Sequence, residues 1–221
     1  MDPWAWLAFT VTLACEAVLL ATVMISLVRP ELRIWPPPRK GTWQFHVTFW
    51  PVVVGVAAAV ALAWRDWNSF VWKADERILV GGALIGVGLG IADWGVRTLG
   101  RIASSGLGGE FREAGPYRYS RNPQYVGDIL ATIGLAVVAN STLLWIAALL
   151  AVVGLVLGPY AEEPWLRARF GESYEAYRAR VPRFVGVPRS RASTGGSRTM
   201  SSTRPPGRSC TPRLPPTTCR S

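Results

Sequence analysis

Residues 129–160 form a continuous stretch without a single charged side chain. An α-helix of this length would extend about 48 Å, whereas the hydrocarbon core of a bilayer is about 30 Å thick. The stretch is therefore too long for one transmembrane helix. Asn140 and Ser141 lie near its middle and are typical turn residues. We predict two helices, at 123–139 and 142–160, joined as a tight hairpin.

Three earlier apolar runs, at 4–28, 45–64 and 78–96, predict three further spans. The first is interrupted only by Glu16, and no basic segment precedes it, so we expect a retained helix and not a signal peptide. Hydrophobic residues make up 50% of the chain and charged residues only 17%, which is below the usual quarter. These features predict an all-α integral membrane protein with about five transmembrane helices.

The charges of the connecting loops predict an orientation. The loops after the first and third predicted helices carry more arginine and lysine than acidic residues, whereas the loop after the second is balanced. Positive loops favour the cytoplasmic side. We expect a multi-pass protein of the plasma (inner) membrane, with its N-terminus outside and its C-terminus in the cytoplasm.

The segment after the last predicted span has one apolar helical face. Its members are spaced four, four, three and four residues apart: Leu166, Phe170, Tyr174, Tyr177 and Val181. Arginines occupy the opposite side. A basic amphipathic helix of this kind is typical of the membrane interface, and Gly171 is a point at which it could divide.

The last part of the chain, residues 188–221, contains seven arginines and no acidic residue, and it is rich in Pro, Ser, Thr and Gly. Such a composition cannot bury enough apolar surface to offset the entropy of ordering. We predict a membrane domain over 1–187 and a disordered basic tail over 188–221.

Residues 115–127, GPYRYSRNPQYVG, place arginines and tyrosines directly before the uncharged stretch. The hairpin returns the chain to the same side of the membrane. Arg118 and Arg121 should therefore emerge beside Glu162 and Glu163. Polar groups at this depth are costly unless they are paired, which favours a pocket. The structural alternative is that the arginines bind lipid phosphate and the glutamates cap a helix.

The segment 115–127 resembles the G-P-Y-R-Y-x-R-H-P-x-Y-x-G motif of the isoprenylcysteine carboxyl methyltransferase and phospholipid methyltransferase families. These are integral-membrane enzymes that use S-adenosylmethionine. Three further segments resemble family motifs in the same order: WGVRTLG at 94–100, AEEP at 161–164 and FGESYEAYRARVPRF at 170–184. The resemblance is strongest over 81–184.

The resemblance implies a site for S-adenosylmethionine. Arg118 or Arg121 would pair with the cofactor's carboxylate, and Glu162 or Glu163 would accept from its ammonium or ribose hydroxyls. The residues implied in cofactor binding are Gly88, Tyr117, Arg118, Arg121, Pro123, Tyr125, Gly127, Glu162 and Glu163. Those implied in catalysis are Arg121, Asn122 and Glu163. Asn122 departs from the family motif, which has histidine there, and asparagine cannot accept a proton at neutral pH.

The implied function is methyl transfer to a lipophilic acceptor at the cytoplasmic face. The acceptor could be a prenylcysteine-type carboxylate or a phospholipid amine. We expect substrate and membrane lipids as partners, and no nucleic acid. No metal site is expected, because the chain has no CxxC and His46 is its only histidine. Two alternatives stay open: an NADPH-dependent reductase of the sterol reductase type, and a non-catalytic protein that keeps the fold.

Overall fold

The computed structural model describes residues 2–71, 75–100 and 113–186, and within these ranges the regular structure is helical. Five α-helices are formed: α1 Pro3–Val28, α2 Trp43–Arg65, α3 Glu76–Leu99, α5 Pro123–Ala139 and α6 Thr142–Arg180. Two short 3₁₀ helices, η1 Pro30–Leu32 and η2 Gly115–Arg118, lie in the connections. The predicted tail at 188–221 lies outside the described residues.

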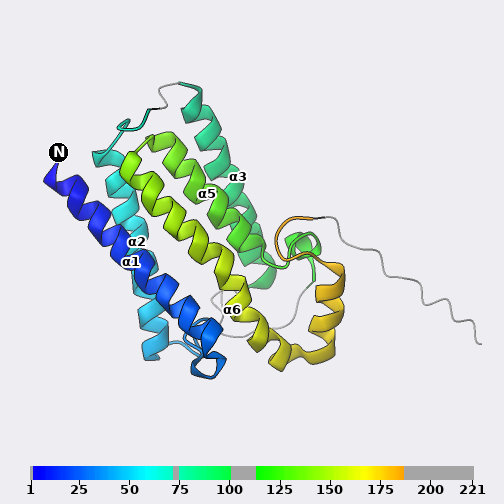
Figure 1. Cartoon of the computed structure of the whole chain (residues 1–221). Helices are drawn as coiled ribbons and strands as arrows, with labels where there is room; N and C mark the ends of the chain where they lie inside the picture. Colours follow the sequence, from blue (N-terminus) through cyan, green and yellow to red (C-terminus); the bar gives the residue numbers. More distant parts are fainter. Residues whose placement is uncertain (1, 72–74, 101–112, 187–221) are drawn as a thin grey trace, which may run out of the picture. The chain divides into compact units, whose positions relative to one another are not determined.

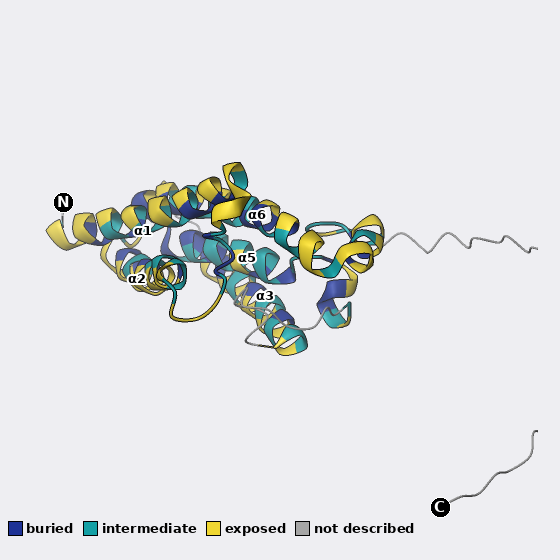
Figure 2. Ribbon diagram, turned by 90° about the horizontal axis from the view of Figure 1, so that it is seen from below, coloured by how far each residue is buried: buried dark blue, intermediate teal, exposed yellow. Residues whose placement is uncertain are grey.

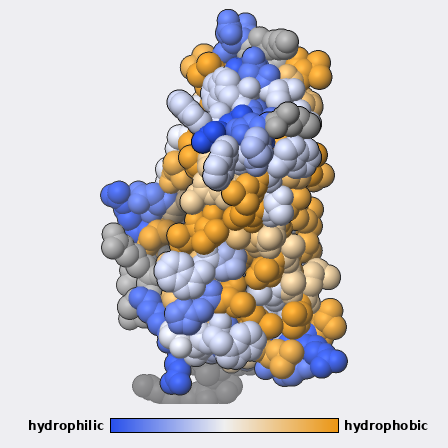
Figure 3. All heavy atoms as spheres, turned by 90° about the vertical axis from the view of Figure 1, so that its left-hand side faces the viewer, coloured by the Kyte–Doolittle hydropathy of each residue, from blue (hydrophilic) through white to orange (hydrophobic). Residues whose placement is uncertain are grey.

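The predicted all-α membrane fold is confirmed. Within the described ranges, α1, α2, α3 and α6 are long and apolar enough to cross a membrane, and α5 is a fifth, shorter apolar helix. Large apolar side chains face outward, such as Leu79, which is 78% exposed, and Leu149, which is 68% exposed. Figure 3 shows apolar side chains over much of the middle of one face, with hydrophilic ones gathered toward its ends. Such a surface suits helices surrounded by lipid.

The helices associate as two pairs that α6 joins. Helix α1 packs on α2 and α6, whereas α5 packs on α3 and α6 (Figure 1). In Figure 2 the ribbon is coloured by burial, and α5 is one of the more enclosed helices, while α1 and α2 expose much of their surface. Helix α2 touches α5 and α6 only lightly. The backbones of α2 and α5 therefore do not pack closely, and side chains of both helices border the space between them.

The predicted hairpin is confirmed at its predicted turn. Asn140 adopts a left-handed conformation with φ 48°, and the Ser141 hydroxyl caps α6 by accepting from the Leu144 amide at 3.0 Å. The Asn140 side chain donates to Asn68 at 2.7 Å and to the Phe70 carbonyl at 3.1 Å. The turn is therefore fastened to the loop that follows α2.

The last predicted span does not end at Tyr160. Helix α6 runs to Arg180 but is divided by a kink at Gly171, a non-helical residue with φ 52°, which is the point at which a division was expected. The apolar face predicted beyond Tyr160 exists, but it packs on the protein itself: Tyr174 and Tyr177 are each only 3% exposed. Hydropathy changes where the surroundings of a helix change. The backbone hydrogen bonds of the helix can continue past that point. A change in composition therefore did not mark a helix end.

The bundle has two distinct ends. Asp2, the loop after α2 and the hairpin turn meet at one end, where Arg65 lies 3.5 Å from Asp2. The other end gathers the loop after α1, the segment before α5 and the part of α6 that carries Glu162. The predicted convergence of Arg121 with the glutamate pair is therefore present. Which end faces the cytoplasm stays a prediction.

Candidate functional site

A cavity of about 620 Å³ runs between α1, α2, α5 and α6. Along most of its length it is lined by apolar or small side chains of these helices, including Val56, Ala131, Ala147 and Leu155. Its polar end is formed by residues from four segments: Trp35, Tyr117, Arg121, Asn122, Tyr125 and Glu162. A volume in this range is typical of small-molecule sites.

Glu162 is the acceptor at the centre of this polar end. Its carboxylate accepts a hydrogen bond from the Tyr125 hydroxyl and another from the Trp35 indole N–H at 3.0 Å. The same indole nitrogen lies 2.9 Å from the Tyr125 oxygen. A loop residue, an α5 residue and an α6 residue are thereby joined, so the geometry of the cavity end is fixed by side-chain hydrogen bonds.

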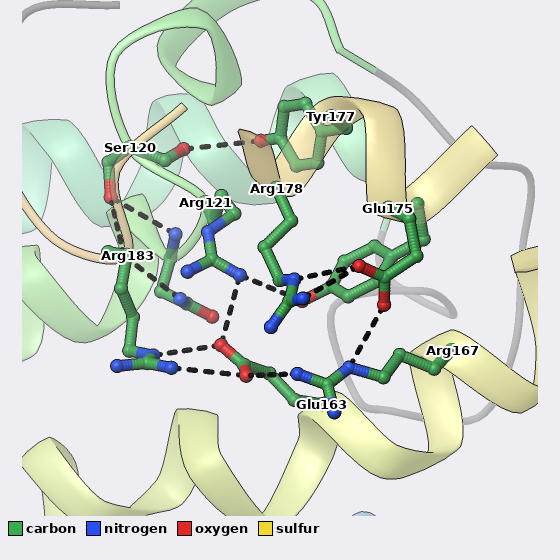
Figure 4. Close-up of polar contacts among 10 residues, drawn as sticks. Ser120, Arg121, Glu163, Arg167, Glu175, Tyr177, Arg178 and Arg183 are labelled. Atoms are coloured by element: carbon green, nitrogen blue, oxygen red, sulfur yellow. Dashed lines mark hydrogen bonds and ion pairs between the residues drawn. The ribbon is translucent and has the colours of Figure 1, made fainter. Parts of the chain in front are cut away.

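Glu163 lies beside the cavity and binds three guanidinium groups (Figure 4). Its carboxylate is 2.9 Å from Arg121 Nη1 and 2.8 Å from Arg183 Nε, with Arg167 at 3.5 Å. The side chains of Arg121 and Glu163 are each only 8% exposed. Charge-assisted bonds of this kind hold guanidinium groups in fixed orientations. Glu163 and Arg121 thus pair directly with each other.

Arg121 is only partly satisfied by these contacts. Nη1 also lies 3.2 Å from the Tyr174 hydroxyl. Its Nε is buried and has no hydrogen-bond partner among the residues that the structure describes. Buried donors are normally paired, and an unpaired one is a reason to look for a ligand. Arg121 also lines the cavity.

The segment after α6 folds back over this network. The Arg121 amide donates to the Pro182 carbonyl at 2.9 Å, and the Asn122 side-chain amide donates to the Arg183 carbonyl at 2.9 Å. The Arg183 guanidinium stacks 3.8 Å from the centre of the Tyr160 ring. Its hydrogen bond to Glu163 raises the pKa of Arg183 above its ordinary value. Residues 182–183 therefore tie the arginine segment to α6.

Tyr117 forms a further wall of the polar end. Its hydroxyl lies 3.0 Å from Gln124 Nε2, and its carbonyl accepts from the Tyr177 hydroxyl at 2.7 Å. Burial raises the pKa of Tyr117 to about 12. The hydrogen bond from Gln124 lowers this pKa, whereas the charge of Glu162 adds to the rise. The Tyr117 hydroxyl is therefore neutral at physiological pH.

Part of the chain that carries this site matches a known protein family. Residues 76–173 match the phospholipid methyltransferase family model. This is one of the two families that the sequence motifs resemble. Comparison with curated proteins gives no match. The match and the apolar helices together indicate a membrane methyltransferase of the phospholipid or isoprenylcysteine type.

Within the segment that matches the family model, five of the residues implied in cofactor binding lie away from the cavity lining: Glu163, described above, and Gly88, Arg118, Pro123 and Gly127. Gly88 and Gly127 face each other where α3 crosses α5: a methyl group added at Gly88 would lie 2.5 Å from the Gly127 carbonyl oxygen. Pro123 is fully buried at the start of α5. Arg118 is exposed. The two glycines provide close helix packing, and their role in cofactor binding stays a prediction.

Two contributors to the candidate site were missed from the sequence. Trp35 stands before a run of three prolines, of which Pro36 and Pro37 are fully buried. A tryptophan directly before such a rigid loop is a sequence feature that could have marked Trp35 as a candidate site residue. Arg183 belongs to the C-terminal segment that resembles the family, but its partner, Glu163, is distant in sequence.

Glu16 also lines the cavity, from the middle of α1, and Asp93 pairs with Arg97 at 2.7 Å on the surface of α3.

Proposed function

We propose that this protein transfers a methyl group from S-adenosylmethionine to a lipophilic acceptor at the cytoplasmic face of the membrane. The observation that carries the proposal is the cavity itself. It joins a cluster of buried donors and acceptors, at one end of the bundle, to apolar helix faces along its length. The family match of residues 76–173 supports the same reaction class.

The residues at the polar end suit the charged groups of S-adenosylmethionine. Arg121 lines the cavity with a buried Nε that has no partner among the described residues, and a guanidinium is a suitable group to bind the cofactor's carboxylate. Glu162 is the corresponding acceptor for the ammonium or the ribose hydroxyls. Tyr117 and Tyr125 supply aromatic faces, which attract a sulfonium cation.

When bound, S-adenosylmethionine would supply a methyl group activated by the sulfonium. The tasks of the chain are then to align this group with an acceptor and to exclude water. Glu163 would act as a positioning residue, because it holds Arg121 while lying outside the cavity lining. Asn122 would position the C-terminal segment through the Arg183 carbonyl. Asn122 does not have to accept a proton to hold this segment.

The apolar part of the cavity suits the hydrocarbon of a lipophilic acceptor. Small residues on α6, such as Ala151 and Gly154, leave room beside α2 and α5. Because α2 touches α5 only lightly, an acceptor would enter from the bilayer between these helices. A carboxylate acceptor needs no base, whereas an amine must arrive neutral. Glu16, Asp128 and Glu162 line the cavity and are the carboxylates placed to receive an amine's proton.

Equilibrium binding of labelled S-adenosylmethionine to purified protein tests the proposal. The parent should bind saturably, and Arg121→Ala should bind about 10- to 100-fold more weakly, because a charge-assisted hydrogen bond contributes about 1.5–3 kcal/mol. Arg118→Ala is the matched control: it removes an exposed arginine three residues away. Folded parent protein that binds NADPH instead would favour the reductase. Protein that binds neither would favour a non-catalytic role.

A further inference from the structure

Gly171 divides helix α6 into a long part and a short one. The backbone there has φ 52° and ψ −130°, a left-handed conformation that glycine adopts at little cost. A methyl group added at Gly171 would meet no neighbouring atom within 4 Å, so the backbone conformation, and not close packing, requires glycine. Beyond this residue the chain turns away from the axis of the long part of α6 (Figure 1). We call residues 172–184, which follow the kink, the C-terminal arm.

The C-terminal arm lies against the polar end of the cavity (Figure 4). Its Tyr174 and Tyr177 are each only 3% exposed and line that cavity. The Tyr174 hydroxyl lies 3.2 Å from Arg121 Nη1, and the Tyr177 hydroxyl donates to the Tyr117 carbonyl at 2.7 Å. Further along the arm, the Pro182 carbonyl accepts from the Arg121 amide at 2.9 Å. The arm therefore covers the arginine that is proposed to bind the cofactor.

A charged cofactor has to reach this end of the cavity from water. S-adenosylmethionine carries a sulfonium, an ammonium and a carboxylate, and moving such groups through hydrocarbon is costly. The rest of the cavity lies between apolar helices, so it suits an acceptor and not the cofactor. At the polar end, the side chain of Arg121 is only 8% exposed. Entry of the cofactor therefore requires a movement of the protein around Arg121.

Polar contacts hold the arm across the site. Three ion pairs join it to residues outside the arm: Arg180 with Glu113 at 2.8 Å, Arg183 with Glu163 at 2.8 Å, and Glu175 with Arg167 at 3.2 Å. A bond whose partners can turn to water contributes only about 1 kcal/mol to stability. The apolar cluster of the arm packs with Leu166 and Phe170, which come directly before the kink. The contacts across the site can therefore open at a lower cost than unfolding of the bundle.

We propose that the C-terminal arm is a lid that turns about Gly171 and opens the polar end of the cavity to water, so that the cofactor enters and its product leaves there. A single residue with a permissive backbone is a suitable hinge. Opening breaks the bonds of the arm to Tyr117, Arg121 and Glu163 and leaves α6 before Gly171 in place. The choice of S-adenosylmethionine as the ligand rests on the proposed function, whereas the movement itself does not.

A reversible lock tests this movement. Glu113→Cys and Arg180→Cys are combined in the full chain, in a background without the native cysteines, and the two thiols are joined with a short bis-methanethiosulfonate. Neither residue lines the cavity, and reductant removes the bridge from the same sample. Association of labelled S-adenosylmethionine is then followed in non-ionic detergent. We expect the bridge to slow association by about 10-fold or more, because the lid then opens only rarely, and reductant to restore it.

Hydrogen exchange at the Arg121 amide gives a second measurement that needs no cofactor, because this N–H is bonded to the Pro182 carbonyl of the arm. The bridge should slow exchange there and within residues 172–184. Without the bridge, the double variant lacks the ion pair of Glu113 and Arg180, and exchange should be about two- to fivefold faster than in the parent. Exchange in α6 before Gly171 should be the same in all states, because the hinge confines the movement.

Glu172→Gln is the matched control, because Glu172 is an exposed acidic residue of the arm that forms no ion pair among the described residues. It should behave like the parent in both measurements. Thermal melting and gel filtration establish that each variant is folded. If the double cysteine variant does not fold, Glu113→Gln replaces it and should speed exchange of the Arg121 amide by about two- to fivefold.

Unchanged exchange of the Arg121 amide in the bridged protein would overturn the lid. Exchange that changes along the whole of α6 would also overturn it, since the movement would then not be hinged at Gly171. Slower exchange with parent-like association of S-adenosylmethionine would contradict the entry route. A parent that fails to bind S-adenosylmethionine, while the bridge slows exchange at Arg121, would reject the proposed function and leave the lid standing.

Discussion

Glu162 and Glu163 are neighbours in α6, yet their carboxylates bind different groups. Glu162 lines the cavity and accepts from Trp35 and Tyr125. Glu163 lies outside the lining and joins Arg121 to Arg183. Adjacent residues on a helix point about 100° apart, which explains the division. The paired glutamates of the sequence therefore separate into one group that faces a ligand site and one that supports it.

This division predicts opposite effects for two matched substitutions. Glu163→Gln should lower the stability of the protein by about 2–3 kcal/mol, since the buried Arg121 guanidinium loses its counter-charge. Glu162→Gln should leave stability nearly unchanged and weaken S-adenosylmethionine binding by about 10-fold or more. Thermal melting and cofactor binding, measured on both variants, check the two halves. The assignment is wrong if Glu162→Gln melts early and Glu163→Gln does not.

Asn122 stands where the resembled motif has histidine, and its contacts predict how changes there behave. Asn122→His should bind S-adenosylmethionine like the parent, because an imidazole N–H can also donate to the Arg183 carbonyl. Asn122→Ala loses that bond and should lower stability by about 1 kcal/mol. Cofactor binding and thermal melting measure the two effects. A clear loss of cofactor affinity in Asn122→His would show that the asparagine amide itself contacts the ligand.

The sequence predicted the helices well because hydropathy is a direct consequence of the membrane. The boundaries of α5, Pro123–Ala139, and the start of α6 at Thr142 were predicted without error, since Asn140 and Ser141 interrupt a stretch that no single span could hold. The end of α6 could not be predicted in this way. Beyond Tyr160 the apolar face of the helix packs on the protein itself, and composition reports the surroundings of a helix more directly than its end.

The site was predicted only in part, because its bonds join distant segments. The approach of Arg121 to Glu163 followed from the parity of the hairpin. The contact of Trp35 with Glu162 depends on how the loop after α1 folds across the bundle, and neither residue type nor spacing reports this. Likewise, Gly88 and Gly127 resemble cofactor-contact glycines in sequence, although their backbones touch across the α3–α5 crossing.

That crossing gives a test with a control on the same helix. Gly88→Ala places a methyl group 2.5 Å from the Gly127 carbonyl oxygen, a backbone atom that cannot rotate away. We expect a loss of about 1–3 kcal/mol from overpacking, seen as a lower melting temperature. Gly90→Ala meets nothing within 4 Å and should be at least as stable as the parent. Equal melting of the two variants would contradict this packing.

Orientation in the membrane is tested by cysteine labelling in intact cells, in a background without the native cysteines. Tyr119 and Val185 are exposed at the end of the bundle that carries the site, and Phe70 lies by the hairpin turn at the other end. Cysteines at 119 and 185 should react only with a membrane-permeant reagent, whereas one at 70 should react with an impermeant one. The opposite pattern would place the site outside the cytoplasm.

Trp35 offers the most selective test of the polar end of the cavity. Trp35→Phe keeps an aromatic ring at the polar end of the cavity but removes the N–H that reaches Glu162 and the Tyr125 oxygen. Loss of one such bond lowers stability by about 1 kcal/mol. Because Glu162 also loses the N–H that orients its carboxylate, we expect S-adenosylmethionine binding to weaken by about fivefold. Trp43→Phe is the control, because Trp43 is 61% exposed at the start of α2. Identical cofactor affinities in the two variants would mean that the Glu162 cluster does not shape the cofactor site.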